Sequence, residues 1–287
     1  MCQDRFEATG WRCPVCYIEP VQVAGFTAFA PQLMTSGQGY DPSFFSRLVD
    51  LESRNFWFRA RNELISWAVG NYFPNARTLL EIGCGTGFVL SGLQNSHPKL
   101  RLYGSEIHIE GLVHATKRLA NATLFQMDAR QIPFEWEFDV VGAFDVLEHI
   151  PEDEAVLGQM YQATRGGGGI IVTVPGHEFL WSPADEHAHH VRRYKPKDLL
   201  LKIERAGFRI LRSTSFVSLL LPALIASRIA QRLRVGSYDE FDELTSGGLV
   251  NASLEKALSF ERLMIRAGVS FFAGGSLLVV AQKVPQS

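Results

Sequence analysis

The chain has 287 residues, 46% of them apolar, which suffices for one large domain or for one domain with additions. Its 28 Lys and Arg residues nearly balance 30 Asp and Glu residues, so no overall basic charge attracts nucleic acid, and we expect no nucleic-acid partner. Four cysteines are too few for a disulfide scaffold, and the longest nearly apolar run, 216–226, is too short to cross a membrane, so we predict a cytoplasmic protein.

Residues 1–40 show no clear periodicity and contain several prolines, which predicts an irregular N-terminal arm. Cys13 and Cys16 in this arm supply half of the four ligands of a tetrahedral zinc site. Cys2 is a third ligand at most. We favour a metal-free turn over a zinc site.

Apolar and aromatic residues recur at helical spacing between Pro42 and Asn71, which predicts a cap of two helices over residues 41–75. Pro74 ends this pattern. Short apolar runs then alternate with helical stretches up to residue 214, and this alternation is typical of an α/β fold with a parallel sheet. The expected strands are Thr78–Ile82, Leu100–Ser105, Thr123–Met127, Phe138–Phe144 and Ile170–Val174.

A glycine-rich turn follows the first of these strands, with Gly83, Gly85 and Gly87 ahead of a helix that begins near Phe88. Glycine at such a turn lets the backbone approach a ligand closely. An NAD(P)-dependent oxidoreductase would place a third glycine at position 88, where this chain has Phe88. The pattern therefore predicts nucleotide binding but disfavours a dinucleotide.

Two further strand ends carry groups that suit a nucleoside. Glu106 can accept hydrogen bonds from both hydroxyls of a ribose, and Asp128 can accept one from the adenine amine beside the amide of Ala129. Each could be a solvated surface charge when taken alone. Ligands of parallel sheets bind beyond the carboxyl ends of the strands, so three neighbouring ends together predict a nucleoside site.

The blocks Leu80–Gly87, Gly104–Ile107, Gln126–Ala129 and Phe138–Ile150 together resemble class I S-adenosylmethionine-dependent methyltransferases, over about residues 42–214 and 271–284. The resemblance implies a Rossmann-like fold: a seven-stranded, mostly parallel sheet whose last strand is antiparallel. The segments Phe208–Ser213 and Ser276–Gln282 fit the sixth strand and the seventh, antiparallel strand of this sheet. It also implies S-adenosyl-L-methionine as cofactor, held by Glu81, Gly83, Cys84, Gly85, Gly87, Glu106, Ile107, Asp128, Ala129 and Phe144.

Two points of this carry-over concern particular side chains. Many relatives have Asp where this chain has Glu106, whose longer side chain still reaches a ribose. In the predicted helical cap, Arg59 or Arg61 would pair with the carboxylate of the cofactor.

The domain organisation follows from these elements. We expect an N-terminal arm (1–40), a helical cap (41–75), a Rossmann-like core (76–214), a helical insertion (215–270), and the last core strand with a tail (271–287). The insertion should hold helices over 223–234 and 252–267, the second capped by Asn251. For this insertion we rank a wall of the acceptor pocket first, a homodimer contact second and a peripheral membrane contact third.

Few catalytic groups are needed for transfer from a sulfonium, because positioning of the nucleophile supplies much of the rate. A base is required only for a protonated acceptor. His149 at the cofactor crevice is the first candidate, although it can equally pack or cap. His190 and Tyr194 are further candidates, in a block that resembles one of bacterial methyltransferases.

A divalent metal is an alternative use of the same region. Asp145, Glu148 and His149 fall on one face of a helical turn, and their O, O, N ligand set suits such an ion. The block also resembles that of ubiquinone-biosynthesis O-methyltransferases.

The sequence thus predicts a methyltransferase that acts on the oxygen or nitrogen of a small molecule or biosynthetic intermediate. A non-catalytic nucleoside-binding module and an NAD(P)-dependent oxidoreductase are the alternatives, and the identity of the acceptor stays open.

Overall fold

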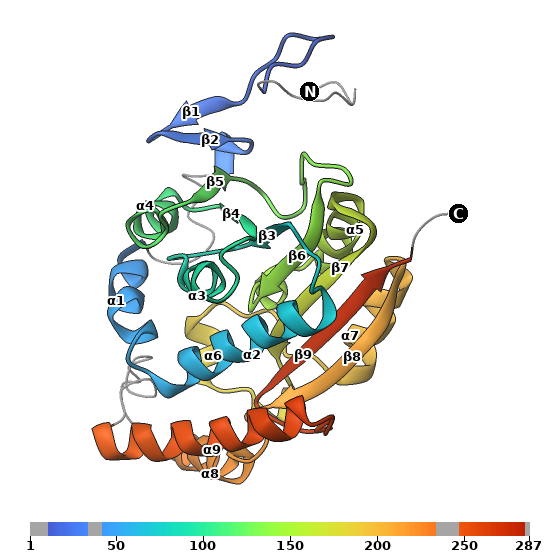
Figure 1. Ribbon diagram of the computed structural model, residues 1–287. Helices are drawn as coiled ribbons and strands as arrows, with labels where there is room; N and C mark the ends of the chain where they lie inside the picture. The colour runs from blue at the N-terminus through green and yellow to red at the C-terminus, as the bar shows by residue number, and fades with distance from the viewer. Residues whose placement is uncertain (1–10, 34–41, 234–246, 285–287) are drawn as a thin grey trace.

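The computed structural model describes residues 11–33, 42–233 and 247–284 (Figure 1). A nine-stranded sheet forms its centre, with the order β1-β2-β5-β4-β3-β6-β7-β9-β8. Strands β3 to β7 run parallel, and β9 lies antiparallel between β7 and β8. Their bounds are β3 Thr78–Ile82, β4 Arg101–Glu106, β5 Ala122–Gln126, β6 Phe138–Phe144, β7 Thr164–Pro175, β8 Phe208–Phe216 and β9 Ser276–Lys283.

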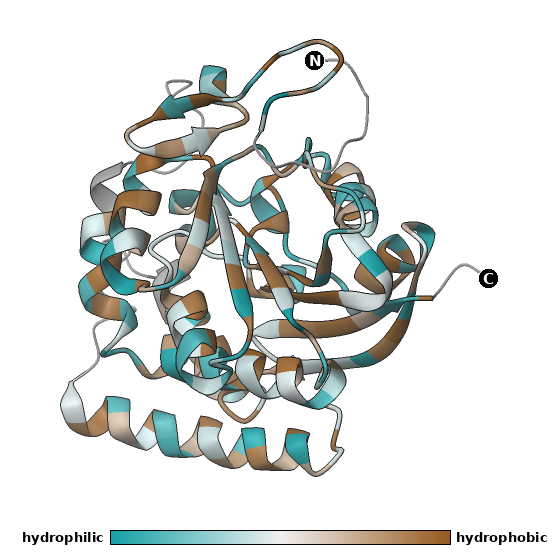
Figure 2. Ribbon diagram, turned by 45° about the horizontal axis from the view of Figure 1, so that its top comes forward, coloured by the Kyte–Doolittle hydropathy of each residue, from teal (hydrophilic) through white to brown (hydrophobic). Residues whose placement is uncertain are grey.

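Helices cover both faces of the sheet, because its central strands are buried on both sides (Figure 1). One face packs on α2 (Phe56–Tyr72), α3 (Phe88–Ser96) and α4 (Ile109–Arg118), and the other on α5 (Asp153–Ala163) and α7 (Pro196–Arg205). Successive residues of a strand point to opposite faces of the sheet, so Leu79 of β3 packs in the hydrophobic core with α2 and Leu80 packs in the core on the other face with α5. Figure 2 colours the ribbon by hydropathy and shows hydrophobic residues along the strands and in the helices that cover them. The predicted Rossmann-like α/β fold, with a mostly parallel sheet and an antiparallel last strand, is confirmed, but the sheet has nine strands where seven were expected.

The N-terminal part departs from the expected arm. β1 (Val21–Val23) and β2 (Phe26–Ala28) form a hairpin, and β2 pairs in parallel with β5, which extends the sheet. Trp11 packs edge-on against Phe29, Phe125 and Phe134, and Phe29 also packs edge-on against Phe134. Strands of three residues are too short to produce a periodic pattern, so this edge was not foreseeable. Cys13 and Cys16 lie in the preceding turn, and Cys2 is outside the described residues.

The two helices of the cap are α1 (Pro42–Glu52) and α2, as predicted. Asn55 caps α2 by accepting a hydrogen bond from the backbone N–H of Trp57. Short helical segments complete the chain: η1 (Pro31–Leu33), η2 (Leu147–His149), η3 (Glu178–Leu180) and α6 (Pro183–His187).

The insertion contains α8 (Leu221–Leu233) and α9 (Gly248–Arg266), which lie together at the bottom of Figure 1. The expectation that Asn251 caps the second helix is wrong, because α9 begins at Gly248, four residues before the predicted start. Asn251 instead accepts a hydrogen bond from the N–H of Phe56 at the start of α2. Gly268 follows the last turn of α9 in the left-handed conformation, φ 103°, which is typical of a glycine that ends a helix. No helix of the described ranges is long and apolar enough to cross a membrane.

Candidate active site

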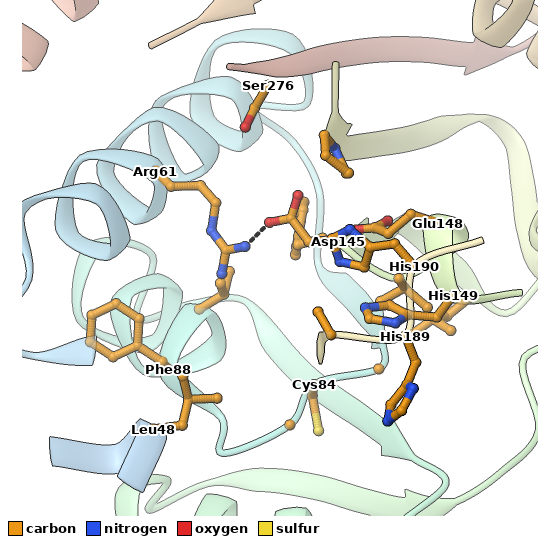
Figure 3. A pocket seen from close by; sticks show the side chains of 18 of the residues that line it. Leu48, Arg61, Cys84, Phe88, Asp145, Glu148, His149, His189, His190 and Ser276 are labelled. Atoms are coloured by element: carbon orange, nitrogen blue, oxygen red, sulfur yellow. Dashed lines mark hydrogen bonds and ion pairs between the residues drawn. The ribbon is translucent and has the colours of Figure 1, made fainter. Parts of the chain in front are cut away.

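One cavity of about 930 Å³ opens at the carboxyl ends of β3, β4, β5 and β6. Side chains from α1, α2, α8 and the segment after β7 also line it. A volume near the upper end of the usual range for ligand sites leaves room for a nucleoside cofactor and a second molecule. Figure 3 shows its polar side, where Arg61 and Asp145 point toward each other and Glu148, His149 and His190 gather together.

The glycine-rich turn forms the floor of the cavity. Gly83, Cys84 and Gly85 line it, whereas Gly87 does not. Gly83 has φ 66°, and a Cβ there would lie 2.5 Å from the side chain of Val146, so only glycine fits. Gly87 has φ 76° at the start of α3, and a Cβ would crowd Ala115. Gly87 therefore shapes the turn without contributing to the cavity surface.

Glu106 is held rigidly at the end of β4. Its Oε2 accepts a hydrogen bond from the N–H of Gly85 at 3.0 Å, and its Oε1 accepts from the N–H groups of Ile107 at 2.8 Å and His108 at 3.1 Å. Each carboxylate oxygen has two lone pairs, so Oε2, which accepts a single hydrogen bond here, retains capacity for a ribose hydroxyl. This geometry fits the expected role of Glu106.

The other expected cofactor residues Ile107, Asp128, Ala129 and Phe144 line the same cavity. Asp128 is ion-paired with Arg130, with 3.0 Å between Oδ1 and Nε. Glu81 is almost fully buried, and this burial raises its pKa well above the ordinary value, against the lowering effect of Arg61. A buried carboxyl of this kind suits a cationic group such as the ammonium of methionine.

The choice between the two arginines of α2 is settled by α9. Arg59 does not line the cavity, because its guanidinium binds Glu255 with Nη2–Oε2 2.6 Å, so its expected cofactor role is corrected. Arg61 lines the cavity, lies over the ring of Trp57 and pairs with Asp145 at the end of β6. Asp145 has φ 56°, a conformation that costs a residue other than glycine free energy and is common at functional sites.

The segment after β7 is organised around Asp185, which was not among the predicted catalytic residues. Its Oδ2 accepts hydrogen bonds from the N–H and hydroxyl of Ser182, closing a capping box on α6. Its Oδ1 lies 2.8 Å from Nδ1 of His190 and 2.7 Å from Nε of Arg193. Burial alone would raise the pKa of Asp185, but His190 and Arg193 lower it to about 2.

This low pKa fixes the tautomer of His190. An ionised Asp185 only accepts hydrogen bonds, so Nδ1 of His190 carries a proton. In neutral His190 the lone pair is therefore on Nε2. The ring of His190 also meets that of His149 edge-on, with centroids 4.7 Å apart.

His149 and Glu148 are unsuited to be the base. Burial, and then the neighbouring His190, lower the pKa of His149 to about 3, so it is a neutral and weakly basic side chain at physiological pH. Burial raises the pKa of Glu148 to about 8, although Arg61 and Arg193 act against this rise. Both carboxyl oxygens of Glu148 lack a hydrogen-bond partner among the described residues.

Tyr194 does not reach the cavity, which corrects its expected catalytic role. Its buried hydroxyl donates to Oδ2 of Asp153 at 2.7 Å, and Lys202 and Arg192 bind the same carboxylate. Burial and then the bond to Asp153 raise the pKa of the phenol, so it stays protonated. The tyrosine anchors the segment after β7 to α5 and α7.

The predicted metal ligands are not brought together as a set. Asp145 pairs with Arg61, and the group that the described residues do assemble is Glu148, His149 and His190, with ligand atoms within 4.8 Å of one another. The positive charges of Arg61 and Arg193 act on Glu148 and disfavour a cation there. We therefore assign no step to a metal ion.

Two contacts at the rim were not predicted. Glu52 at the end of α1 accepts a hydrogen bond from the hydroxyl of Thr86 in the glycine turn, at 2.6 Å, and pairs with Arg118 of α4. These bonds hold α1 over the cofactor end of the cavity. At the other end, Leu224 and Arg228 of α8 form part of the wall, whereas α9 packs against α2 and does not line it.

Comparison with known proteins finds relatives that are similar over part of the chain. Residues 79–168 match the methyltransferase domain family. A "Probable S-adenosylmethionine-dependent methyltransferase" of Mycolicibacterium smegmatis is 24% identical over 164 residues, which are 56% of this chain and 62% of that protein. A ubiquinone biosynthesis O-methyltransferase of Azoarcus sp. is 23% identical over 198 residues, covering 59% of this chain and 84% of the relative.

Solved structures agree on the fold. The Haemonchus contortus phosphoethanolamine N-methyltransferase 2 has a TM-score of 0.57 and 18% identity, covering 88% of this chain and 59% of that one. The chain spans about three fifths of the length of the first curated relatives it matches. Over residues 79–168 its sequence is similar to methyltransferase domains, and its fold is that of class I S-adenosylmethionine-dependent methyltransferases.

Proposed function

We propose that this protein transfers the methyl group of S-adenosylmethionine to a hydroxyl or amine of a small-molecule acceptor, with His190 as the general base. The pair of Asp185 and His190 in the cofactor cavity carries this proposal. The ubiquinone biosynthesis O-methyltransferase and trans-aconitate 2-methyltransferase among its relatives support a small acceptor.

The cofactor would bind along the glycine turn. Glu106 would accept a hydrogen bond from a ribose hydroxyl through Oε2, Asp128 and the amide of Ala129 would contact adenine, and Arg61 would bind the methionine carboxylate. Glu81 and Asp145 would face its ammonium. The sulfonium would then lie beside Gly83, within the cavity that His190 also lines.

The reaction would be a direct displacement. The acceptor oxygen or nitrogen forms a bond to the methyl carbon while the carbon–sulfur bond breaks and its electron pair returns to sulfur, giving S-adenosylhomocysteine. Nε2 of His190 takes the acceptor proton, and Asp185 stabilises the resulting imidazolium.

The experiment is label transfer. The protein would be incubated with methyl-labelled S-adenosylmethionine and fractionated extracts of small molecules, and products would be followed by mass shift. Label in a small molecule supports the proposal. Cofactor binding without any transfer would support the non-catalytic nucleoside-binding alternative.

A further inference from the structure

Helix α9 carries apolar side chains on two opposite faces. Leu258 and Ile265 are buried on its inner side. Phe260 and Leu263 follow Leu249 by 11 and 14 positions, which are close to three and four full helical turns, so the three side chains lie on one outward face of the helix. Leu249, Phe260 and Leu263 are 89%, 59% and 61% exposed. A surface helix needs only one apolar stripe, so the second suggests a further partner.

The helix is a firm support for this outward face. Arg59 and Arg262 form ion pairs that join α9 to α2, through Glu255 and Glu63. Glu261 accepts hydrogen bonds at 2.7 Å from the N–H groups of Ser218 and Leu219, at the start of the segment that leads into α8. The outward residues are therefore presented by a fixed element.

The loop after α9 adds a protruding aromatic ring. Phe272 is 90% exposed, although the backbone before it is held by hydrogen bonds. Arg212 donates hydrogen bonds to the carbonyls of Gly268 and Val269, and the N–H of Phe271 donates to the hydroxyl of Thr214. Ile229 on α8 is exposed as well. We call Ile229, Leu249, Phe260, Leu263 and Phe272 the α8–α9 face.

Exposed charges among the described residues of this face are basic. Lys256 lies on the same outward side of α9 as Phe260, and Arg266 ends the helix. The acidic residues of α9 point elsewhere, since Glu255 is paired with Arg59 and Glu261 is buried. Separated apolar side chains that protrude among basic groups suit the boundary between headgroups and acyl chains.

From these observations we propose that the α8–α9 face docks on the surface of a lipid bilayer that carries anionic headgroups. The contact is peripheral, with Phe272, Leu249, Phe260 and Leu263 entering the headgroup region and Lys256 and Arg266 facing lipid phosphates. A two-fold contact between copies is less suited, because it would bring two basic faces together. Since α8 also lines the cavity through Leu224 and Arg228, docking would bring that end of the cavity close to the membrane.

Vesicle sedimentation tests this proposal without reference to catalysis. The full chain would be mixed with vesicles of phosphatidylcholine alone, or with roughly one third phosphatidylglycerol. We expect binding to the anionic vesicles only, and about tenfold weaker binding when salt is raised from about 0.05 to about 0.5 M. The double variant Leu263→Ser/Phe272→Ser should bind about tenfold more weakly.

The matched control is Leu201→Ser on α7, which removes an apolar side chain of 50% exposure from another surface and should leave binding unchanged. If the double variant loses its circular dichroism signature, the exposed charge reversal Lys256→Glu/Arg266→Glu takes its place, with the same expected loss. Absence of vesicle binding, equal binding to both vesicle types, or equal losses in variant and control would overturn the proposal. So would a dimer in light scattering that the double variant dissociates while vesicles stay unbound.

Discussion

Asp185 and His190 form a hydrogen-bonded pair, with 2.8 Å between Oδ1 and Nδ1, on the wall of the cavity that holds the glycine turn. Asp185 is 1% exposed and its pKa is lowered to about 2, so it remains ionised throughout the physiological range. The pair orients one imidazole nitrogen toward its carboxylate and leaves the other for the acceptor.

Asp185→Asn should slow methyl transfer by about 10²-fold or more, because an amide can donate to Nδ1 and so impose the wrong tautomer on His190. The affinity for S-adenosylmethionine should change little, since Asp185 lies outside the proposed cofactor contacts. Single-turnover rates and calorimetry separate these effects. A variant that loses cofactor affinity while its chemical step stays fast would contradict the assignment.

Arg61→Met should weaken cofactor binding about 10- to 100-fold, because a charge-assisted hydrogen bond contributes about 1.5–3 kcal/mol. Arg59→Met is the matched control on the same helix. It removes the ion pair with Glu255 and should leave the dissociation constant of S-adenosylmethionine within about twofold. Equal losses in calorimetry would show that Arg61 has no special role.

Glu148 makes the stability of the fold depend on pH. Its folded-state pKa is raised to about 8, so ionisation favours the unfolded chain, and the free energy of unfolding should fall as pH rises from about 4.5 to 8. Glu148→Gln should abolish this pH-dependent loss of stability, because glutamine does not ionise. Urea denaturation should find the variant more stable than the wild type at pH 8, with the difference shrinking toward pH 4. A difference that is the same at both pH values would refute this interpretation.

Tyr194→Phe tests the correction made at that residue. The change removes a buried hydroxyl bonded to Asp153, which should lower the free energy of unfolding by about 1–3 kcal/mol. The methyl-transfer rate of the folded variant should stay within a few-fold of the wild type. A rate loss of about 10²-fold in a variant of unchanged stability would restore Tyr194 to the catalytic residues.

The fold was predictable where the pattern is local. β3 and β6 occupy the predicted residues, because continuous apolar runs mark strands that are buried on both faces. The glycine turn was equally clear. The hairpin of β1 and β2 was not, since its pairing with β5 depends on residues nearly a hundred positions away.

The side-chain roles were harder to predict for the same physical reason. Arg59 and Arg61 are two positions apart on a helix and therefore point to different sides. Glu255, which forms the ion pair with Arg59, lies 196 residues further along the chain. Likewise, His149 and His190 cannot be ranked as bases from their positions in the chain. Burial separates them by lowering the pKa of His149 to about 3.

Transfer of label from S-adenosylmethionine by His190→Gln, compared with the wild type in a single turnover on the acceptor found in extracts, tests the central claim most directly. We predict an unchanged affinity for the cofactor and a methyl-transfer rate that falls by about 10²–10⁴-fold, because glutamine cannot accept the proton. A folded His190→Gln protein that transfers the methyl group at the wild-type rate would contradict the proposed role of His190.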